Sequence, residues 1–581
     1  MLYPKLTEQA TERKMVDSFR GYNHNLRIGS GEFYDMENMS SISYPVLSPR
    51  GKRGIYAEPE NAQGLIAKDS LCYVDGTYFC MNEYRIDMGL STAEEDNPKS
   101  LVSMGAYVII LPDKKYINTK DITEFGSIEA SVTSTGAVSF ELCKLDGSSY
   151  SNMIVSAAEP ANPKNMDVWL DTSATPNVLK QYSATNSMWV TIATTYIKIS
   201  AEGIGIPFEV YDGVAISGIE SPKLQDLNAN VIIQAKGDDY IVVTGVLDSI
   251  ATQEAAVTVK RTMPNMDFVT ESGNRLWGCR YGTASNGEIV NEIYASKLGD
   301  FKNWNCFMGL STDSYAASCG TDGQFSGAVT HLGYPIFFKE TCLHKVYGTQ
   351  PSNFQIQTTV CRGVQRGCER SLAIVNEILY YKARSAVCAY DGSLPTEMST
   401  ALGEEVYSDA VAGAHGNKYY ISMMSTDGKF HLFVYDTAKG MWHREDNTKA
   451  RAFCSCRGEM YFIDEADGKI KTVFGSGTLE EEPVKWMAET GTLGTDSPDK
   501  KYVSRIILRM GLEIGTRVTL EAQYDSSSKW EHLSSMVGTS LRSFSVSVRP
   551  KRCDHFKLRI IGEGPAKIYS YVKTIEQGSD Y

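Results

Sequence analysis

The side chains that could support catalysis are spread along the chain rather than gathered in a motif. Eight histidines are dispersed, and two of them, His331 and His344, fall in neighbouring expected strands, where hydrogen-bonded structural histidines are commoner than a metal site. The sequence contains no Gly-x-Ser-x-Gly elbow, phosphate-binding loop, His-Glu-x-x-His pair or dinucleotide-binding glycine signature. The sequence therefore predicts no catalytic residue, no metal site and no cofactor.

Carboxylates are the remaining candidates for catalysis. The chain has 70 Asp and Glu residues, but a glycosidase needs two carboxylates at a defined separation, which a sequence does not reveal. The stretch from Ser296 to Trp304 has the residue types of the sialidase repeat Ser-x-Asp-x-Gly-x-x-Trp at a different spacing. We therefore expect that the protein is not an enzyme, with a glycosidase as a distant alternative.

Thirteen cysteines are scattered from Cys72 to Cys553, an odd number that fits reduced thiols in a protein made in a cytosol. The closest pair, Cys454 and Cys456, has no second pair at the spacing of zinc ligands. We expect buried thiols rather than a metal site.

Three aromatic residues could contact a ligand. Trp169, Tyr182 and Trp189 lie on consecutive short expected strands in a region rich in Ser, Thr and Ala. Such rings either pack a small core or form a platform on which sugar rings stack. Because the region has few other apolar residues to bury, we expect a core, and a glycan or partner contact is the alternative.

The bulk composition describes a large globular protein. At 581 residues, with 42% hydrophobic and 22% charged residues, the chain is long enough for several domains and too apolar to be disordered. The mean hydropathy is −0.25, and no apolar run approaches the roughly 18 residues that a membrane span needs. The polar start, residues 1–14, does not resemble a secretory signal. We expect a soluble protein without a membrane span.

The net charge restricts the kind of partner. A charge of −13 and a pI of about 5.3 have the wrong sign for a protein that holds nucleic acid through its phosphates. A channel lined with negative charge could still let DNA pass without trapping it. The composition is compatible with a DNA conduit and does not establish one.

The elements that would position these residues are clearest in one stretch, residues 266–307. It reads as a strand that ends in 274–278, a polar turn, a second strand at 292–296, and an aromatic plug of Trp304 and Phe307. Weaker versions recur on both sides about every 40 to 50 residues, which is the spacing of a β-propeller. Two units before a long insertion and five after it predict about seven blades, within a range of six to eight.

The signature residues of this blade are expected to pack it rather than to catalyse a reaction. They are Asn274, Arg275, Trp277, Gly299, Asp300 and Trp304.

The predicted fold class is all-β. It is a β-propeller interrupted by inserted small β modules, with a C-terminal antiparallel β-sandwich. The expected parts are an extended N-terminal arm (1–45), the first blades (46–120), a Ser/Thr-rich β module (121–202), a second small barrel or sandwich (203–262), the remaining blades (263–484) and the sandwich (485–581). A short basic turn at 45–54 is either a solvated loop or a contact with a subunit or DNA.

Three stretches carry a resemblance to a known family. The first is 19–23 (FRGYN) with 50–54 (RGKRG), although Arg20 and Tyr22 stand where that family has small residues. The second is 274–278 (NRLWG) followed by 293–300 (IYASKLGD) and Trp304. The third consists of short segments between 345 and 392, namely 345–348, 367–368, Ser371, 379–381 and 391–392. Together they resemble the propeller-bearing tail nozzle, tail hub or packaged-DNA stabilisation proteins of short-tailed bacteriophages and related prophages.

The resemblance implies a structural virion protein, made and assembled in the bacterial cytoplasm. It would form a ring, which we expect to be a hexamer, below the portal and adaptor proteins of the tail. Such a ring would retain packaged double-stranded DNA, conduct it on infection without sequence-specific binding, and anchor fibres or receptor-binding proteins. The alternative function is a carbohydrate- or receptor-binding propeller of the tail.

Overall fold

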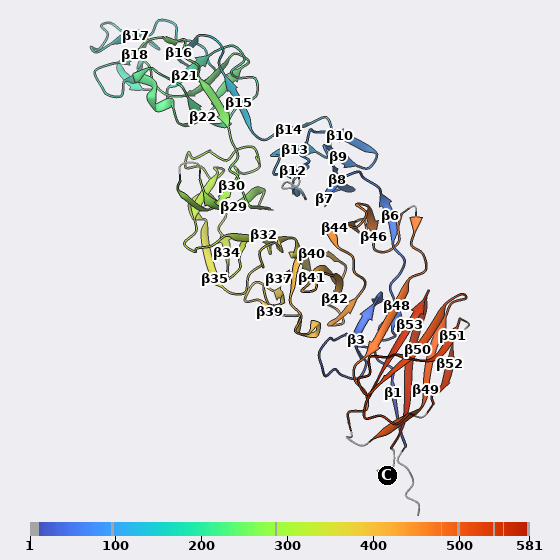
Figure 1. Cartoon of the computed structure of the whole chain (residues 1–581). Coiled ribbons are helices and arrows are strands. Elements are labelled where there is room, and N and C mark those ends of the chain that lie inside the picture. Colours follow the sequence, from blue (N-terminus) through green and yellow to red (C-terminus); the bar gives the residue numbers. More distant parts are fainter. Residues whose placement is uncertain are drawn as a thin grey trace, which may run out of the picture.

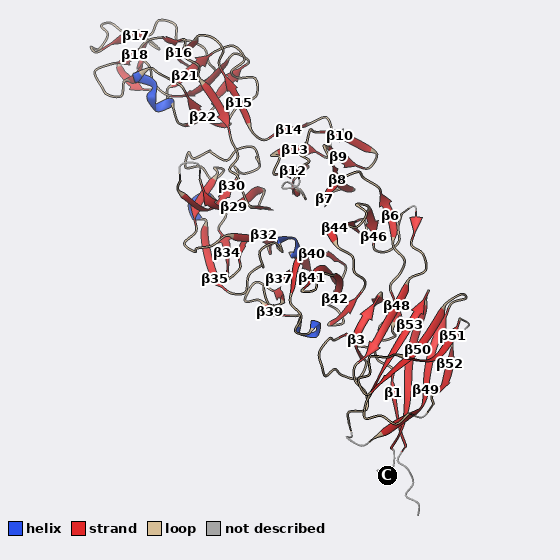
Figure 2. Ribbon diagram, viewed as in Figure 1, coloured by secondary structure: helices blue, strands red, loops and turns tan. Residues whose placement is uncertain are grey.

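The computed structural model describes residues 11–93, 98–284, 287–477, 479–496, 500–538, 541–549 and 551–577. The molecule is elongated, with an inserted domain at one end, a ring of small sheets in the middle and a large sandwich at the other end (Figure 1). In the described part, the regular structure is strand apart from short 3-10 turns (Figure 2). None of these turns is long and apolar enough to cross a lipid bilayer.

The ring is a β-propeller, as the repeat predicts. Across the described residues it has seven antiparallel blades of four strands each. Blades 1 and 2 are β7 (Ala62–Ala67), β8 (Leu71–Asp75), β9 (Tyr78–Met81) and β10 (Tyr84–Asp87), then β11 (Ser100–Met104), β12 (Tyr107–Leu111), β13 (Lys115–Asn118) and β14 (Phe125–Ser127). Blades 3 and 4 are β28 (Phe268–Ser272), β29 (Arg275–Thr283), β30 (Ile289–Ala295) and β31 (Tyr315–Ser318), then β32 (Phe325–His331), β33 (Tyr334–Lys339), β34 (Cys342–Tyr347) and β35 (Gln355–Val360).

The remaining blades follow the same pattern. Blades 5 and 6 are β36 (Ala373–Val375), β37 (Ile378–Lys382), β38 (Val387–Tyr390) and β39 (Thr396–Glu397), then β40 (Tyr407–His415), β41 (Lys418–Ser425), β42 (Phe430–Asp436) and β43 (Met441–Arg444). Blade 7 is β44 (Ala450–Cys456), β45 (Glu459–Asp464), β46 (Ile470–Thr472) and, from the start of the chain, β6 (Gly54–Ala57). The first strands of neighbouring blades lie side by side around the axis, with η4 (Glu369–Ser371) between β32 and blade 5.

Apolar side chains fill the space between neighbouring blades. Val74 of blade 1 packs with Val108 of blade 2, and Leu71 of blade 1 packs with Ile463 of blade 7. The propeller is therefore a closed ring with a continuous wall of buried contacts.

The ring is closed by a strand from the other end of the chain. β6 pairs with β46 in antiparallel register, with Thr472 opposite Gly54, and β47 (Leu479–Glu480) pairs with its other edge. We expected 46–120 to form only the first blades, and the structure corrects this because β6 is the outer strand of the last blade. Local sequence does not indicate the partner of such a strand, since the two segments are 418 positions apart.

The insertion between blades 2 and 3 is one domain with a nested sheet. Its strands are β15 (Ala130–Thr133), β16 (Val138–Cys143), β17 (Ile154–Ser156), β18 (Val168–Asp171), β19 (Val178–Ser183), β20 (Met188–Thr191), β21 (Tyr196–Ser200), β22 (Gly213–Ser217), β23 (Asn230–Ile232), β24 (Ala235–Gly237), β25 (Tyr240–Thr244), β26 (Ala251–Gln253) and β27 (Thr258–Arg261). The expected division at residue 202 is wrong, because β16 and β21 share a sheet with β24, β25 and β26. Phe140, Ile199 and Ile241 belong to one buried core across that boundary.

The C-terminal domain is a sandwich of two sheets. Its strands are β48 (Lys485–Thr490), β49 (Lys501–Leu512), β50 (Arg517–Tyr524), β51 (Glu531–Val537), β52 (Arg542–Ser547), β53 (Phe556–Glu563) and β54 (Ala566–Gln577). Buried and accessible residues alternate along β49 and β50, as a strand with one face on a core requires.

The N-terminal arm completes this sandwich and joins it to the propeller. Its strands are β1 (Thr11–Val16), β2 (Gly21–Tyr22), β3 (Glu32–Glu37), β4 (Met39–Ser40) and β5 (Ser48–Pro49), whereas residues 1–10 lie outside the described part. β1 pairs with β54, and β3 pairs with β48. Because the arm pairs with different sheets in short pieces, its sequence shows no sustained period.

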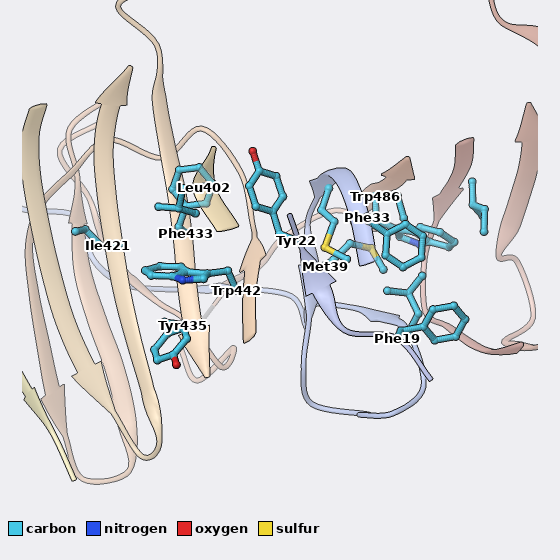
Figure 3. Close-up of a cluster of buried hydrophobic side chains, with 14 of the residues drawn as sticks. Phe19, Tyr22, Phe33, Met39, Leu402, Ile421, Phe433, Tyr435, Trp442 and Trp486 are labelled. Carbon is cyan, nitrogen blue, oxygen red and sulfur yellow. The ribbon is translucent and has the colours of Figure 1, made fainter. Parts of the chain in front are cut away.

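A single ten-stranded sheet results, running from blade 6 through β2 and β3 into the sandwich. Buried rings line this bridge: Tyr22 packs against Phe433 at 5.4 Å, and Phe19 against Phe33 at 5.7 Å between ring centroids (Figure 3). The propeller and the sandwich are thereby held as one unit.

Candidate functional site

A cavity of about 610 Å³ lies on the propeller axis. Its wall comes from the first strands of the blades, including Gly64 on β7, Ala328 on β32, Ala412 on β40 and Ala452 on β44. Small side chains at these positions leave the converging strands unable to fill the space between them. Ligand sites in proteins are typically concave spaces of about 300–1,000 Å³ with a few polar groups.

The segment that returns from the insertion forms part of this wall. Met263, Pro264, Asn265, Met266 and Asp267 line the cavity. Met266 lies against Gly278 of β29, where a Cβ atom would stand 2.0 Å from the Met266 sulfur. Gly278 therefore lets this segment approach the blade closely.

Two cations in the wall have different partners. Lys99 forms an ion pair with Asp113 at 2.8 Å, and both side chains are almost fully buried. Arg370 donates from Nη2 to the carbonyl oxygen of Pro98 at 2.8 Å, and no carboxylate pairs with it among the described residues. Burial lowers the pKa of Arg370, and the nearby Glu369 only partly opposes this. Arg370, like Arg280, whose Nη1 reaches only the Asn265 carbonyl oxygen at 3.5 Å, forms no ion pair among the described residues and is left to meet a ligand.

The cavity continues past Arg370 into a second space of about 410 Å³. Glu369, Arg370 and Val411 line both parts. In the second part Arg451 pairs with Glu465 at 2.7 Å.

Carboxylates in the main cavity are Asp267 and Glu369. The Asp267 carboxylate accepts a hydrogen bond from the backbone N–H of Tyr281 at 2.8 Å. Burial raises the pKa of Asp267 above its usual range, against this hydrogen bond and the charge of Arg280. The cavity therefore offers acceptors and cationic donors together, which suits a ligand rich in hydroxyl groups.

The sequence did not single out Glu369 and Arg370. Charged residues before a strand usually belong to a solvated turn. The only feature of the sequence that could have indicated Glu369 and Arg370 is their position just ahead of the first strand of a blade. The axial placement follows from the assembly of seven blades, which no local pattern encodes.

The structure brings the three predicted aromatic residues together on the sheet β17–β20. Trp189 packs edge-on against Trp169 and Tyr182, at 5.4 Å and 5.3 Å between ring centroids. Trp169 is 4% exposed and donates from Nε1 to the Ser156 carbonyl oxygen at 2.9 Å. Lys180, paired with Asp171 at 2.8 Å, lies over the Trp169 ring. The rings form a small packed cluster rather than a flat platform, and Tyr182 and Trp189 are half-buried.

The signature residues of blade 3 lie inside or at the turns of that blade. Arg275 is 2% exposed and donates to the carbonyl oxygens of Ser296 and Ser311, each at 2.8 Å. Trp277 and Trp304 are buried. Phe307, expected beside Trp304 in an aromatic plug, is instead 56% exposed.

The remaining signature residues shape two turns. Asn274 adopts a left-handed conformation between β28 and β29, and its carbonyl oxygen accepts from the N–H of Gly299 at 2.8 Å. The Asp300 carboxylate accepts from Asn303 at 2.6 Å.

The basic turn at 45–54 is only partly solvated: Pro45, Gly51 and Lys52 are exposed, whereas its arginines pair within the chain. Arg50 pairs with Glu481 at 2.6 Å, and Arg53 pairs with both Glu445 and Asp446 at 2.7 Å. These ion pairs lie within the chain, next to the strand that closes the ring.

Both histidines singled out in the sequence are buried and hydrogen-bonded. His331 contacts the carbonyl oxygen of Glu377 at 2.6 Å, and His344 contacts Thr321 and Thr358, each at 2.9 Å. Within the described ranges, no three His, Cys, Asp or Glu side chains are placed to hold a metal ion. All thirteen cysteines are free thiols, and Cys361 and Cys454 alone are partly accessible.

His344 makes stability depend on pH. Burial, helped by the charge of Lys339, lowers its pKa from 6.5 to about 4. The pKa of His344 is lower in the folded state than in the unfolded state. The free energy of unfolding is therefore at its full value above pH 6.5 and decreases as the pH falls towards 4, by about 3 kcal/mol in all. The free energy of unfolding, measured between pH 7 and 4, should decrease less steeply with falling pH in His344→Gln than in wild type. Parallel curves would contradict it.

The closed ring of blades defines the chain as a β-propeller protein with a cavity on the axis. Neither a scan against protein-family models nor a search of curated proteins found a match. Solved structures that it resembles include an exo-β-1,3-galactanase from Phanerochaete chrysosporium, at 7% identity over 52% of this chain and 94% of the other, with a TM-score of 0.21.

Two further solved structures have similar values. A family 43 arabinoxylan arabinofuranohydrolase from Bacillus subtilis is 8% identical over 52% of this chain and 94% of its own, with a TM-score of 0.20. PorZ, a surface component of the type-IX secretion system of Porphyromonas gingivalis, is 11% identical over 88% of this chain and 77% of its own, with a TM-score of 0.25.

The expectation that the protein is not an enzyme is contradicted, because the solved structures that it resembles include glycoside hydrolases. A likeness at these TM-scores assigns no reaction and no substrate to this chain.

Proposed function

We propose that the protein is a carbohydrate-binding propeller that holds a saccharide in its axial cavity. The observation that carries the proposal is the cavity itself, with Arg370, Glu369, Asp267 and Arg280 lining a space of about 610 Å³. A saccharide presents many hydroxyl groups, each able to donate and accept a hydrogen bond. The cavity wall offers carboxylates as acceptors and guanidinium groups as donors.

A glycan array with the purified full chain would identify the saccharide. The cavity is then tested by Ala452→Trp, which places an indole in its wall. We expect this variant to lose at least about tenfold in affinity, because the ring occupies the volume that the ligand needs. Titration calorimetry with the saccharide selected by the array measures the change.

Ala466→Trp is the matched control, since Ala466 is an exposed turn residue of the same blade. It should bind as wild type does. Equal affinity of Ala452→Trp and wild type would place the site elsewhere, and Trp189→Ala would then show whether the aromatic cluster on β17–β20 is responsible.

The second candidate function is a bacteriophage tail component that forms a ring and anchors other tail proteins. The resemblance of the stretches at 19–23, 274–278 and 345–348 supports it, and the ten-stranded sheet joins the propeller and the sandwich within one subunit, which could pack head to tail in a closed ring. Electron microscopy of the purified chain, with and without its tail neighbours, tests it. Cyclic symmetry would support a ring, and a monomer under all conditions would contradict it.

A further inference from the structure

The inference concerns Arg370, at the junction of the two parts of the axial cavity. It lines both parts and makes one hydrogen bond, to the Pro98 carbonyl oxygen. A guanidinium has five N–H donors in a fixed planar fork. Most of the donors of Arg370 therefore have no partner among the described residues.

Arg370 is half-buried, and several more deeply buried cations of the described chain are compensated. Arg53 meets two carboxylates, Arg261 pairs with Asp212, and Lys99 pairs with Asp113. Arg275 has no carboxylate, but its donors reach several backbone carbonyl oxygens. Arg370 differs from these, because no carboxylate pairs with it and its charge faces the cavity; Arg280, on the same wall, likewise forms no ion pair among the described residues.

The surroundings of Arg370 compensate its charge only in part, because Glu369 and Glu465 lie near it without forming an ion pair with it. Glu465 is paired with Arg451, and the positive charge of Arg451 disfavours a second cation nearby. Glu369 precedes Arg370 in the chain and forms no ion pair with it at 4 Å or less. An anion bound here would relieve this repulsion and replace the water that the guanidinium has lost.

We propose that the saccharide held in the axial cavity is acidic and that Arg370 binds its carboxylate. This rests on the proposed function of the cavity and specifies its ligand. A carboxylate matches the planar fork of a guanidinium with two parallel hydrogen bonds, and such pairs are stronger than bonds between neutral groups. The remaining hydroxyl groups of the sugar meet Glu369, Asp267 and the backbone of the cavity wall.

The net charge of −13 limits the length and charge density of this ligand. Repulsion from the surface is screened beyond about 8 Å at physiological salt, so one acidic sugar in the cavity gains more from Arg370 than it loses. A densely charged polymer would be repelled along its whole length. The structure thus favours a chain end or a short oligosaccharide over a polyanion.

The test compares an acidic saccharide with its carboxyl-reduced form. A glycan array carrying uronate, sialate and neutral glycans selects the acidic oligosaccharide, and calorimetry measures its affinity and that of its carboxyl-reduced counterpart. Arg370→Gln should weaken the acidic ligand about 10- to 100-fold and change the reduced one by less than about threefold. Arg370→Lys should recover part of the loss, because it restores the charge without the fork.

Arg384→Gln is the control, since Arg384 is exposed in the same blade and lies outside the axial cavity. It should match wild type for both ligands, and thermal unfolding checks that each variant is folded. The inference would be overturned if Arg370→Gln lost the same affinity for both ligands, or if wild type preferred neutral glycans. The proposal that the cavity binds a saccharide would then still stand. An array on which wild type binds nothing would remove the proposed function as well.

Discussion

Replacing Arg53 with alanine is expected to lower the free energy of unfolding of the propeller by about 3–5 kcal/mol. Arg53 precedes β6, and its side chain and that of Glu445 are 5% and 4% exposed. Burial alone would lower the pKa of Arg53, but Asp446 and Glu445 outweigh it and raise the pKa. Without the guanidinium, Glu445 would stay buried and unpaired, and Asp446 would keep only its longer pair with Arg50 at 3.5 Å; leaving a buried carboxylate unpaired is the costly way to break a buried ion pair.

The effect should concentrate where the ring closes. Hydrogen exchange of the amides in β6 and β46 should accelerate more in Arg53→Ala than exchange in blades 3 and 4. Lys223→Ala, which removes an ion pair whose lysine is 61% exposed, should cost less than about 1 kcal/mol. A double variant, Arg53→Ala with Glu445→Ala, should lose less than the sum of the single losses. Additive losses would show that the pair does not act as a unit.

Replacing Arg261 with alanine is expected to cost about 3–5 kcal/mol and to loosen the insertion. Arg261 ends β27 and pairs with Asp212, both nearly fully buried, and donates from Nε to the Ile128 carbonyl oxygen at 3.0 Å. Asp212 also accepts from Asn303 of blade 3 at 2.8 Å. Losing the guanidinium would leave the Asp212 charge buried at the root of the insertion.

Urea unfolding and hydrogen exchange across β22 and β27 would measure this effect. Lys260→Ala is the control, because Lys260 is the exposed neighbour on the same strand, and it should change stability by less than about 1 kcal/mol. If Arg261→Ala were as mild as this control, the pair would not anchor the insertion.

The propeller could be predicted because each blade carries its own signals. In blade 1, Asp75 ends β8 opposite Tyr78 of β9, and Gly76 and Thr77 form the hairpin turn between them, with Gly76 at φ +58°, as a tight turn between two strands requires. The partners of β2, β6 and the strands of the insertion could not be predicted. Their pairing is set by packing between segments far apart in the chain, and the local residues are compatible with many partners.

The site was predicted less well than the fold. Trp169, Tyr182 and Trp189 do meet, because they lie on paired strands. The axial cavity was missed because its wall is assembled from separate blades, and the small residues in it, such as Ala412 and Ala452, carry no chemical signal. Arg370 gains its significance from burial and from the lack of an acidic partner, and both depend on tertiary structure.

The most direct test of the account is an experimental structure of the full chain bound to the oligosaccharide that the glycan array selects. The account predicts the sugar in the axial cavity, with its acidic group within hydrogen-bond distance of Arg370 and its hydroxyl groups near Glu369. A sugar bound against Trp189 on β17–β20, or any site away from the axis, would contradict it.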